Sequence, residues 1–261
     1  MGDARKNKEL LLAFDRIRVL VAKDFKLKYN STALGFLLSL LVPMFTSGVY
    51  FFVFGTMMRF NSKNYLLYLM SGTFLWQFFS NVIVMSGASL MGNAGLLKKT
   101  NFNRELIVWG TFFTECAHFF LTIPVLVGIM LFYGVIPDPI TILPNLVVVF
   151  LAIMLLTVGL GFAYAAINVF FRDLERIMMI FLMAWMFASP VFIPVENVPE
   201  KWMWVYKVNP AAVILKIWRD IFYVPTWHPG DWLPLLAVCG FVFFAGRWVF
   251  RKMEAGFAEM M

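Results

Sequence analysis

The segment from residue 92 to residue 100, GNAGLLKKT, comes closest in this sequence to a phosphate-binding loop. That motif is G-x-x-x-x-G-K-[ST], in which backbone N–H groups surround the phosphates and the lysine reaches them. If the motif ended on Lys99 and Thr100, glycine would be required at positions 93 and 98, which hold Asn93 and Lys98. We therefore expect no nucleotide to bind this chain here, and we identify no catalytic residue.

Glu115 and His118 form a Glu-x-x-His pair, the second pattern that could carry chemistry. The pair shares one helix face, as in di-iron bundles, but those sites need two such motifs and two further carboxylates. Only one other histidine exists, His228. We predict no metal site and no cofactor on this chain. Packing toward the protein interior, or closeness to a membrane interface, accounts better for the pair.

The composition indicates the surroundings in which these residues must be positioned. Of the 261 residues, 61% are hydrophobic and only 14% are charged, whereas about a quarter are charged in an ordinary soluble domain. A soluble globule could not hide so much apolar surface. The formal net charge is +7, but Lys and Arg flank apolar runs, which is typical of membrane topology and not of nucleic-acid binding. Lipid is therefore the expected solvent.

Six apolar segments are long or continuous enough to cross a bilayer. They cover residues 33–58, 66–91, 107–133, 142–170, 177–193 and 232–250. They do not alternate with a period of two, so we expect helices, which satisfy their backbone hydrogen bonds internally. The fifth is short, with Pro190 and Pro194 near its end. The sequence predicts an all-α integral membrane protein, a single domain with six transmembrane helices. Cys116 and Cys239 lie in apolar runs and are expected to be buried thiols.

Residues 8–29 predict an amphipathic helix in the membrane interface. Leu10, Phe14, Ile17, Val21 and Phe25 fall on one stripe, and basic residues lie outside it. A soluble helix would need a globular core to pack on, which this composition does not provide. The basic residues outside the stripe are Arg16, Arg18, Lys23, Lys26 and Lys28.

The distribution of Lys and Arg predicts the orientation. Sixteen of the 22 lie on one side of the six segments, namely Arg5, Lys6, Lys8, Arg16, Arg18, Lys23, Lys26, Lys28, Lys98, Lys99, Arg104, Arg172, Arg176, Arg247, Arg251 and Lys252. By the positive-inside rule this side is cytoplasmic and holds both termini.

The outer loop at 194–231 is long and rich in tryptophan and tyrosine. Asn209 and Pro210 read as an N-cap followed by proline at the first helical position. The apolar run 211–223 is too short to span a bilayer, so we expect a re-entrant helix, paired with a shorter one near 200–207. An amphipathic surface helix anchored by its tryptophans is the alternative.

Two further stripes could line a passage for sugars. The first span carries Ser39, Pro43, Ser47, Tyr50 and Phe54 on one face, and the fifth carries Phe181, Trp185, Ala188 and Phe192. Aromatic faces suit the C–H faces of sugar rings, while hydroxyl groups offer hydrogen bonds. Ordinary helix packing or lipid contact is the alternative, given that aromatic residues make up 18% of the chain.

In its order of motifs the whole chain resembles the permease subunit of type-2 ABC exporters for polysaccharides, the O-antigen, capsule and teichoic-acid group. The resemblance is carried by the basic N-terminal helix, the loop LKKTNFNRE at 97–105, the FRDLER run at 171–176, and Asn209-Pro210 opening an apolar helix that ends in Arg219-Asp220.

The resemblance implies a homodimeric channel in the bacterial inner membrane, driven by two copies of a separate cytoplasmic ATPase that holds ATP and Mg²⁺. It implies that 97–106 is a helix that couples to the ATPase, with Lys98, Lys99, Asn103, Arg104 and Glu105 as its contacts. The outer helix would gate the exit through Asn209, Pro210, Trp218 and Arg219. The substrate implied is a lipid-linked glycan, whose pyrophosphate the N-terminal basic residues could steer, although anionic lipid explains them equally.

Other functional classes remain open at this point. An exporter of the same superfamily for teichoic acid, capsule, a drug, haem or a lipid would share the topology. A membrane enzyme would need convergent polar residues at one interface, and a passive channel would not need a coupling loop.

Overall fold

The computed structural model describes residues 2–29, 33–57, 64–99, 102–171, 173–223 and 229–260, and all regular structure in these ranges is helical. The long helices are α1 (Gly2–Tyr29), α2 (Ala33–Tyr50), α3 (Tyr65–Gly92), α5 (Glu105–Phe132), α6 (Pro139–Phe170) and α10 (Pro229–Met253). The shorter helices are α4 (Ala94–Lys99), α7 (Leu174–Phe187), α8 (Met203–Val208), α9 (Pro210–Tyr223) and α11 (Phe257–Met260).

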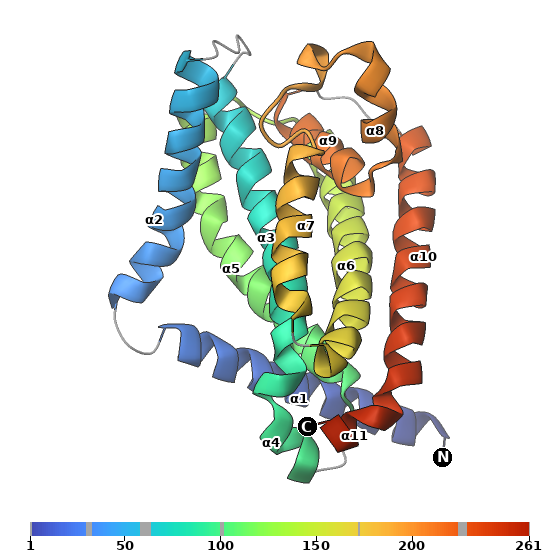
Figure 1. Cartoon of the computed structure of the whole chain (residues 1–261). Helices are drawn as coiled ribbons and strands as arrows, with labels where there is room; N and C mark the ends of the chain where they lie inside the picture. The colour runs from blue at the N-terminus through green and yellow to red at the C-terminus, as the bar shows by residue number, and fades with distance from the viewer. Residues whose placement is uncertain are drawn as a thin grey trace.

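Within these described ranges, four helices are long and apolar enough to cross a membrane, at Tyr65–Gly92, Glu105–Phe132, Ile142–Phe170 and Gly230–Gly256. They run side by side as the trunk of the bundle (Figure 1). The helix α2 continues into a π-helical segment, Phe51–Met57, and contributes a shorter apolar helix, Leu41–Met57. The second, third, fourth and sixth predicted segments therefore correspond to the trunk helices, with boundaries that differ by a few residues.

The fifth predicted segment, 177–193, ends earlier as a helix than expected. The helix α7 has 14 residues and stops at Phe187, and the chain then turns through residues 188–191. Proline at 190 cannot donate a helical hydrogen bond, and it also disfavours helical backbone in the residue before it. The apolar run Val191–Ile193 is instead packed inside the fold, where Val191 and Phe192 are buried.

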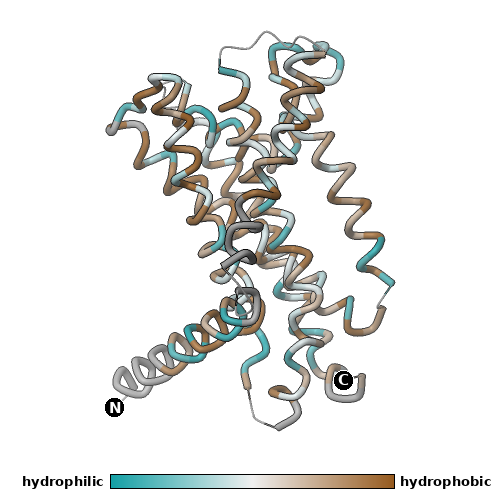
Figure 2. Tube along the Cα trace, turned by 90° about the vertical axis from the view of Figure 1, so that its left-hand side faces the viewer, coloured by the Kyte–Doolittle hydropathy of each residue, from teal (hydrophilic) through white to brown (hydrophobic). Residues whose placement is uncertain are grey.

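The first helix lies across one end of the bundle, and we call this the α1 end (Figure 1). Figure 2 shows it projecting obliquely, with hydrophilic and hydrophobic residues alternating along its described part. Leu20 of α1 is buried and contacts α5 at Gly110, where an added Cβ would lie 3.2 Å from the Leu20 Cβ. The expected stripe is divided, because Ile17, Val21 and Phe25 are half-buried whereas Phe14 is exposed.

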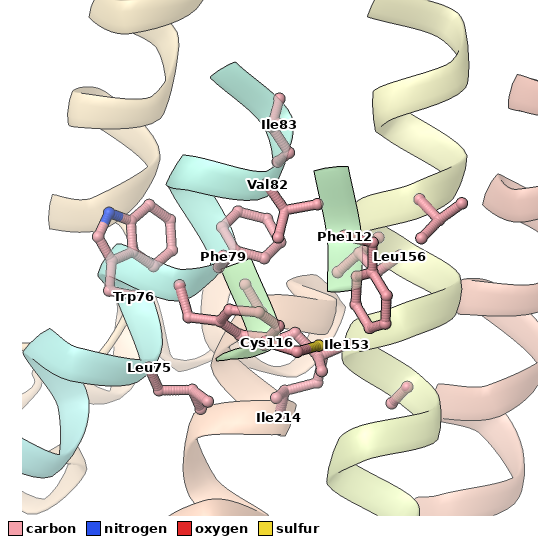
Figure 3. Packing of buried hydrophobic residues seen from close by; sticks show 14 of the residues in the cluster. Leu75, Trp76, Phe79, Val82, Ile83, Phe112, Cys116, Ile153, Leu156 and Ile214 are labelled. Atoms are coloured by element: carbon pink, nitrogen blue, oxygen red, sulfur yellow. The ribbon is translucent and has the colours of Figure 1, made fainter. Parts of the chain in front are cut away.

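The core runs along the trunk and reaches α9. Figure 3 shows Leu75, Trp76, Phe79, Val82 and Ile83 from α3 together with Phe112 and Cys116 from α5, Ile153 and Leu156 from α6, and Ile214 from α9. The two cysteines are buried thiols, as predicted.

The helices α6 and α10 approach each other closely at Gly159. A Cβ built there would lie 2.6 Å from the backbone Cα of Phe243, and Gly246 meets the same turn of α6. Small residues allow such close backbone contact, which is a common way for helices to associate in lipid. The last trunk helix is thus held against α6 by close backbone contact at Gly159, and also by ring contacts of Phe162 with Phe243 and Phe250.

Candidate functional sites at the two ends of the bundle

The segment expected to be one coupling helix over 97–106 is divided in the structure. The helix α4 ends at Lys99, Phe102 and Asn103 are not helical, and α5 begins at Glu105. Lys98 and Lys99 form the end of α4, and their side chains lie outside the described part of the chain. Asn103 is exposed and accepts a hydrogen bond at Oδ1 from the backbone N–H of Glu105 at 3.1 Å. Its side chain therefore helps to start α5.

Arg104 faces the end of the chain. Its guanidinium donates to the carbonyl oxygen of Glu254 at 2.7 Å and lies 3.7 Å from the Glu254 carboxylate. The same group lies 5.7 Å from the centre of the Phe257 ring. Arg104 thus fastens the segment before α5 to the residues that follow α10.

Glu105 is almost buried and is held by two arginines of α10. Its carboxylate accepts a hydrogen bond from Arg251 Nε at 2.7 Å, and from Arg247 Nε at 3.1 and 3.2 Å. The Glu105 side chain is 11% exposed, against 36% for Arg247 and 61% for Arg251. A carboxylate in the first turn of a helix also interacts favourably with the helix dipole.

The opposite end of the bundle carries α8 and α9, and we call it the α9 end (Figure 1). Asn209 caps α9 as predicted, since its Oδ1 accepts the backbone N–H of Ala211 at 3.0 Å. The same oxygen accepts Trp185 Nε1–H at 2.8 Å, and Asn209 Nδ2 donates to Ser189 Oγ at 2.9 Å and to the Ala188 carbonyl at 3.2 Å. One side chain therefore joins the start of α9 to the end of α7.

Arg219, farther along α9, is buried, and within the described residues it forms no salt bridge with a carboxylate. Its guanidinium donates to the carbonyl oxygens of Pro190, Val191 (2.9 Å) and Tyr68 (3.3 Å). Its Cζ lies 3.5 Å from the centre of the Tyr68 ring, a cation–π contact. Carbonyl dipoles and an aromatic face thus compensate the buried charge.

Trp218 completes the attachment of α9. Its indole N–H donates to the Ser71 carbonyl of α3 at 3.0 Å, and the ring is 3% exposed. Pro210 stands at the first helical position and is half-buried. Three of the four expected gate residues, Asn209, Trp218 and Arg219, therefore make contacts that fix α9 to α3 and to the turn after α7.

A cavity of about 440 Å³ borders α9 between α8 and α10. Its lining is mainly apolar and includes Met203, Val213 and Leu235, with an ion pair between Lys216 and Asp231 at 2.8 Å beside it. Burial raises the pKa of the Tyr206 phenol on this cavity above its ordinary value. The helix α9 thus packs against α3 and α6, and the cavity separates part of its other side from α8 and α10.

The two stripes expected to line a passage mostly pack within the chain. Ser47 is buried and shares a hydrogen bond of 2.8 Å with Thr73 of α3. The rings of Tyr50 and Phe54 pack on Phe192, with centroids 4.4 and 5.3 Å away. Trp185 meets Phe79 edge to face, and Phe181 is exposed. Ser39 lies in α2, and its side chain falls outside the described part.

The Glu115 and His118 pair lies on α5, where Glu115 is buried and His118 is stacked on Phe25 of α1 at 5.5 Å. No group of three or more potential metal-ligating side chains occurs within the described residues. The predicted packing toward the interior describes Glu115, and His118 belongs to the contact between α1 and α5.

Several residues that organise these ends have no motif in the sequence. Tyr65 and Tyr68 donate to the carbonyls of Phe192 (2.9 Å) and Pro190 (3.0 Å). Arg247 and Arg251 converge on Glu105. The i, i+4 spacing of those arginines on one face of α10 was a usable signal, because two like charges on one helix face in an apolar segment call for an acidic partner.

The arrangement defines a multi-pass helical membrane protein with one polar, tightly connected site at each end of an apolar trunk. The chain belongs to the family described as ABC-2 type transporter, which matches residues 15–223. Two relatives from Klebsiella pneumoniae, both named O-antigen export system permease protein RfbA, are 31% and 32% identical over 249 residues, 95% of each chain. A protein of the same name from Myxococcus xanthus is 29% identical over 246 residues, covering 92% of this chain and 93% of that one.

Proposed function

We propose that this chain is the membrane-spanning subunit of an ATP-driven exporter that moves lipid-linked polysaccharide of the O-antigen type out of the cytoplasm. The observation that carries the proposal is the identity of about one third along nearly the full length of two proteins named as O-antigen export permeases. The apolar trunk supplies the membrane part of such a machine. Hydrolysis of ATP belongs, in this proposal, to a separate partner chain that also holds Mg²⁺.

The proposed topology has six spans, with both termini in the cytoplasm and the chain in the bacterial inner membrane. The helix α2 with its π-helical continuation and the short helix α7 add the first and fifth crossings to the four trunk helices. The α1 end is then the cytoplasmic end, and the excess of Lys and Arg there supports this orientation. The helix α1 lies in the inner membrane interface, where its basic residues face anionic lipid or a pyrophosphate group.

The ATPase docks, in this proposal, on the short helix α4 and the residues that lead into α5; we call residues 94–105 the docking segment. Lys98, Lys99 and the exposed Asn103 are the proposed contacts. Arg104 and Glu105 face this chain's own C-terminal region. We therefore assign them to the connection between the docking segment and the trunk, and not to direct contact with the partner.

The outer site is proposed to act as a gate in a homodimer. Two copies of α9 would flank one exit, each held to its own protomer by Asn209, Trp218 and Arg219. The cavity beside α9 supports this proposal, because it leaves space next to part of the helix. The exposed face of α7, which includes Phe181, is the part of the proposed passage surface least used for packing within the chain.

Deleting the gene in its host and analysing surface polysaccharide tests the proposed function. Loss of surface glycan, accumulation of lipid-linked glycan inside the cell, and rescue by the intact gene are the expected results. Normal surface polysaccharide, with loss of a different exported compound, would instead assign the chain to another type-2 exporter. If the purified chain hydrolysed ATP without a partner, this would contradict the proposal that ATP hydrolysis belongs to a separate chain.

A further inference from the structure

At the α1 end, the residues just before and at the start of α5 contact three parts of the molecule at once. Phe102 lies under the guanidinium of Arg16 on α1, 5.5 Å from the ring centre. Arg104 bonds the backbone of Glu254 after α10. Glu105 is held by Arg247 and Arg251 within α10. These contacts connect the docking segment to the interfacial helix on one side and to the last trunk helix on the other.

We propose that Glu105, Arg247 and Arg251 form a clamp that transmits movement of the docking segment to α10, and that Glu105 is a positioning residue for export. The inference rests on the proposed function, because it needs an ATPase that moves the segment. The inference names α10 as the element that receives the movement. Neither the family resemblance nor the names of the relatives connect α10 with coupling.

Glu105 is bonded to both arginines of α10. Both carboxylate oxygens are used: Oε1 receives Arg251 at 2.7 Å, and Oε2 receives Arg247 at 3.1 to 3.2 Å. Charge-assisted bonds of this kind are roughly twice as strong as neutral ones. Arg104, the preceding residue, bonds Glu254, the first residue after α10, so the segment holds both α10 and the chain that follows it.

Movement of α10 would reach the other trunk helices through α6. The backbone contact between Gly159 and Phe243 leaves no flexible side chain between the two helices at that point. Close-packed interfaces shift between discrete arrangements and do not deform gradually. A push on the docking segment would therefore move α10 with its contact on α6, provided that Glu105 holds.

The test uses the full exporter complex in proteoliposomes and measures glycan exported per ATP hydrolysed. Glu105→Gln keeps the size of the side chain but removes its charge, and Arg251→Gln removes one arginine. Both arginines are partly exposed, so water can solvate them and the fold should survive. We expect export per ATP to fall about fivefold or more in each variant, the lower range of measured coupling between sites. Adding Arg251→Gln to the Glu105→Gln protein should cause little further loss, because the partner is already gone.

Lys252→Gln is the matched control. It removes a positive charge from the next residue, whose ammonium lies 5.1 Å from the Trp248 ring centre and not on Glu105. Export per ATP should stay at the wild-type value. Glu105→Asp, which keeps the charge on a shorter side chain, should restore part of the coupling.

The outcomes separate the clamp from the proposed function. If the wild-type complex fails to export glycan, the proposed function fails. If the wild type exports, and Glu105→Gln and Arg247→Gln/Arg251→Gln do so at the wild-type ratio, the clamp is wrong. If Glu105→Gln does not assemble, the double arginine variant decides, since it leaves Glu105 in place and changes only partly exposed side chains.

Discussion

The indole N–H of Trp185, near the end of α7, donates to the side-chain oxygen of Asn209, which caps α9, at 2.8 Å. The same oxygen accepts the backbone N–H of Ala211, so one atom serves as both helix cap and tertiary contact. Two elements that are separate in the sequence therefore meet at a single amide group.

Replacing Asn209 by Ala should lower the free energy of unfolding by about 2 kcal/mol. Loss of a helix cap costs about 1 kcal/mol, and loss of hydrogen bonds to buried partners adds a similar amount. Thermal unfolding in detergent, followed by fluorescence, measures the effect. Asn197→Ala is the control, because Asn197 is exposed; equal midpoints for the two variants would contradict the role given to Asn209.

Arg219 should tolerate substitution poorly for a different reason. Arg219→Gln leaves the carbonyls of Pro190, Val191 and Tyr68 with fewer donors in a buried site, and also removes the contact with the Tyr68 ring. A buried acceptor left without a donor costs about 1 to 3 kcal/mol, so the loss of these bonds together should cost about 3 kcal/mol. We expect a strongly lowered unfolding midpoint and reduced yield of folded protein.

Lys216→Gln is the matched control for Arg219→Gln, since it removes a positive charge from the same helix. Its ion pair with Asp231 is roughly half exposed, and exposed pairs contribute about 0 to 1 kcal/mol. A midpoint lowered as much by Lys216→Gln as by Arg219→Gln would show that net charge, and not the buried contacts, determines the effect.

The sequence predicted the two ends of the bundle unequally. Asn209 followed by proline has a local meaning, because a cap and the first helical position are defined by neighbouring residues. The apolar runs likewise predicted the trunk helices. Arg219 could not be placed in the same way, since its partners are carbonyl groups some 30 and 150 residues away, and a backbone carbonyl leaves no signal in a sequence.

The docking segment likewise shows that the sequence does not identify the contact partners of its polar residues. The family resemblance implied one helix over 97–106 with five contacts to the ATPase, but Arg104 bonds Glu254 just after α10 and Glu105 turns toward α10. A charge pattern shows that charged residues need interaction partners, but it does not show whether those partners lie on the same chain or on another one. The extent of α7 was also overestimated, because an apolar run continues through Val191 and Phe192 as buried, non-helical chain.

The contact between α6 and α10 should be sensitive to a single methyl group. In Gly159→Ala the new Cβ would lie 2.6 Å from the Phe243 Cα, so the helices must separate. Overpacking of this kind costs about 1 to 3 kcal/mol. Gly240→Ala is the control in α10, where a Cβ meets nothing within 4 Å. We expect a lowered unfolding midpoint for Gly159→Ala and an unchanged or raised one for Gly240→Ala; the reverse order would contradict the packing.

Reversing the charges of Lys98 and Lys99 should weaken ATPase docking while leaving the permease folded. Lysines at the end of α4 are suited to contact an acidic surface of the partner, and like charges across an interface are costly. A loss of about 1.4 kcal/mol would lower the affinity about tenfold. Titration of the purified ATPase onto permease in nanodiscs measures it. Lys201→Glu/Lys207→Glu, at the α9 end, changes the net charge equally and should bind normally; equal affinity of all three proteins would contradict the docking site.

The gate proposal is best tested by cysteines placed along α9. The residues buried within the protomer include Ile214, Ile217 and Ile221, whereas Lys216 is exposed and Val213 and Asp220 are half-buried. We expect a water-soluble maleimide to label positions 213, 216 and 220 and to spare 214, 217 and 221. Cys116 and Cys239 are buried, so background labelling should be low. Equal labelling at all six positions would mean that α9 is solvated and does not pack as described.

A protected face alone does not make α9 a gate, so labelling must also be compared between resting and transporting complexes. If two α9 helices close one exit, then positions 213, 216 and 220 should react more slowly at rest than during ATP-driven export, because the partner copy covers them. In the Lys216→Cys variant, a disulfide formed between the two protomers at this position should then block export until it is reduced. Labelling rates that do not change with ATP and glycan, together with full export by the oxidised protein, would show that α9 is a fixed part of the bundle.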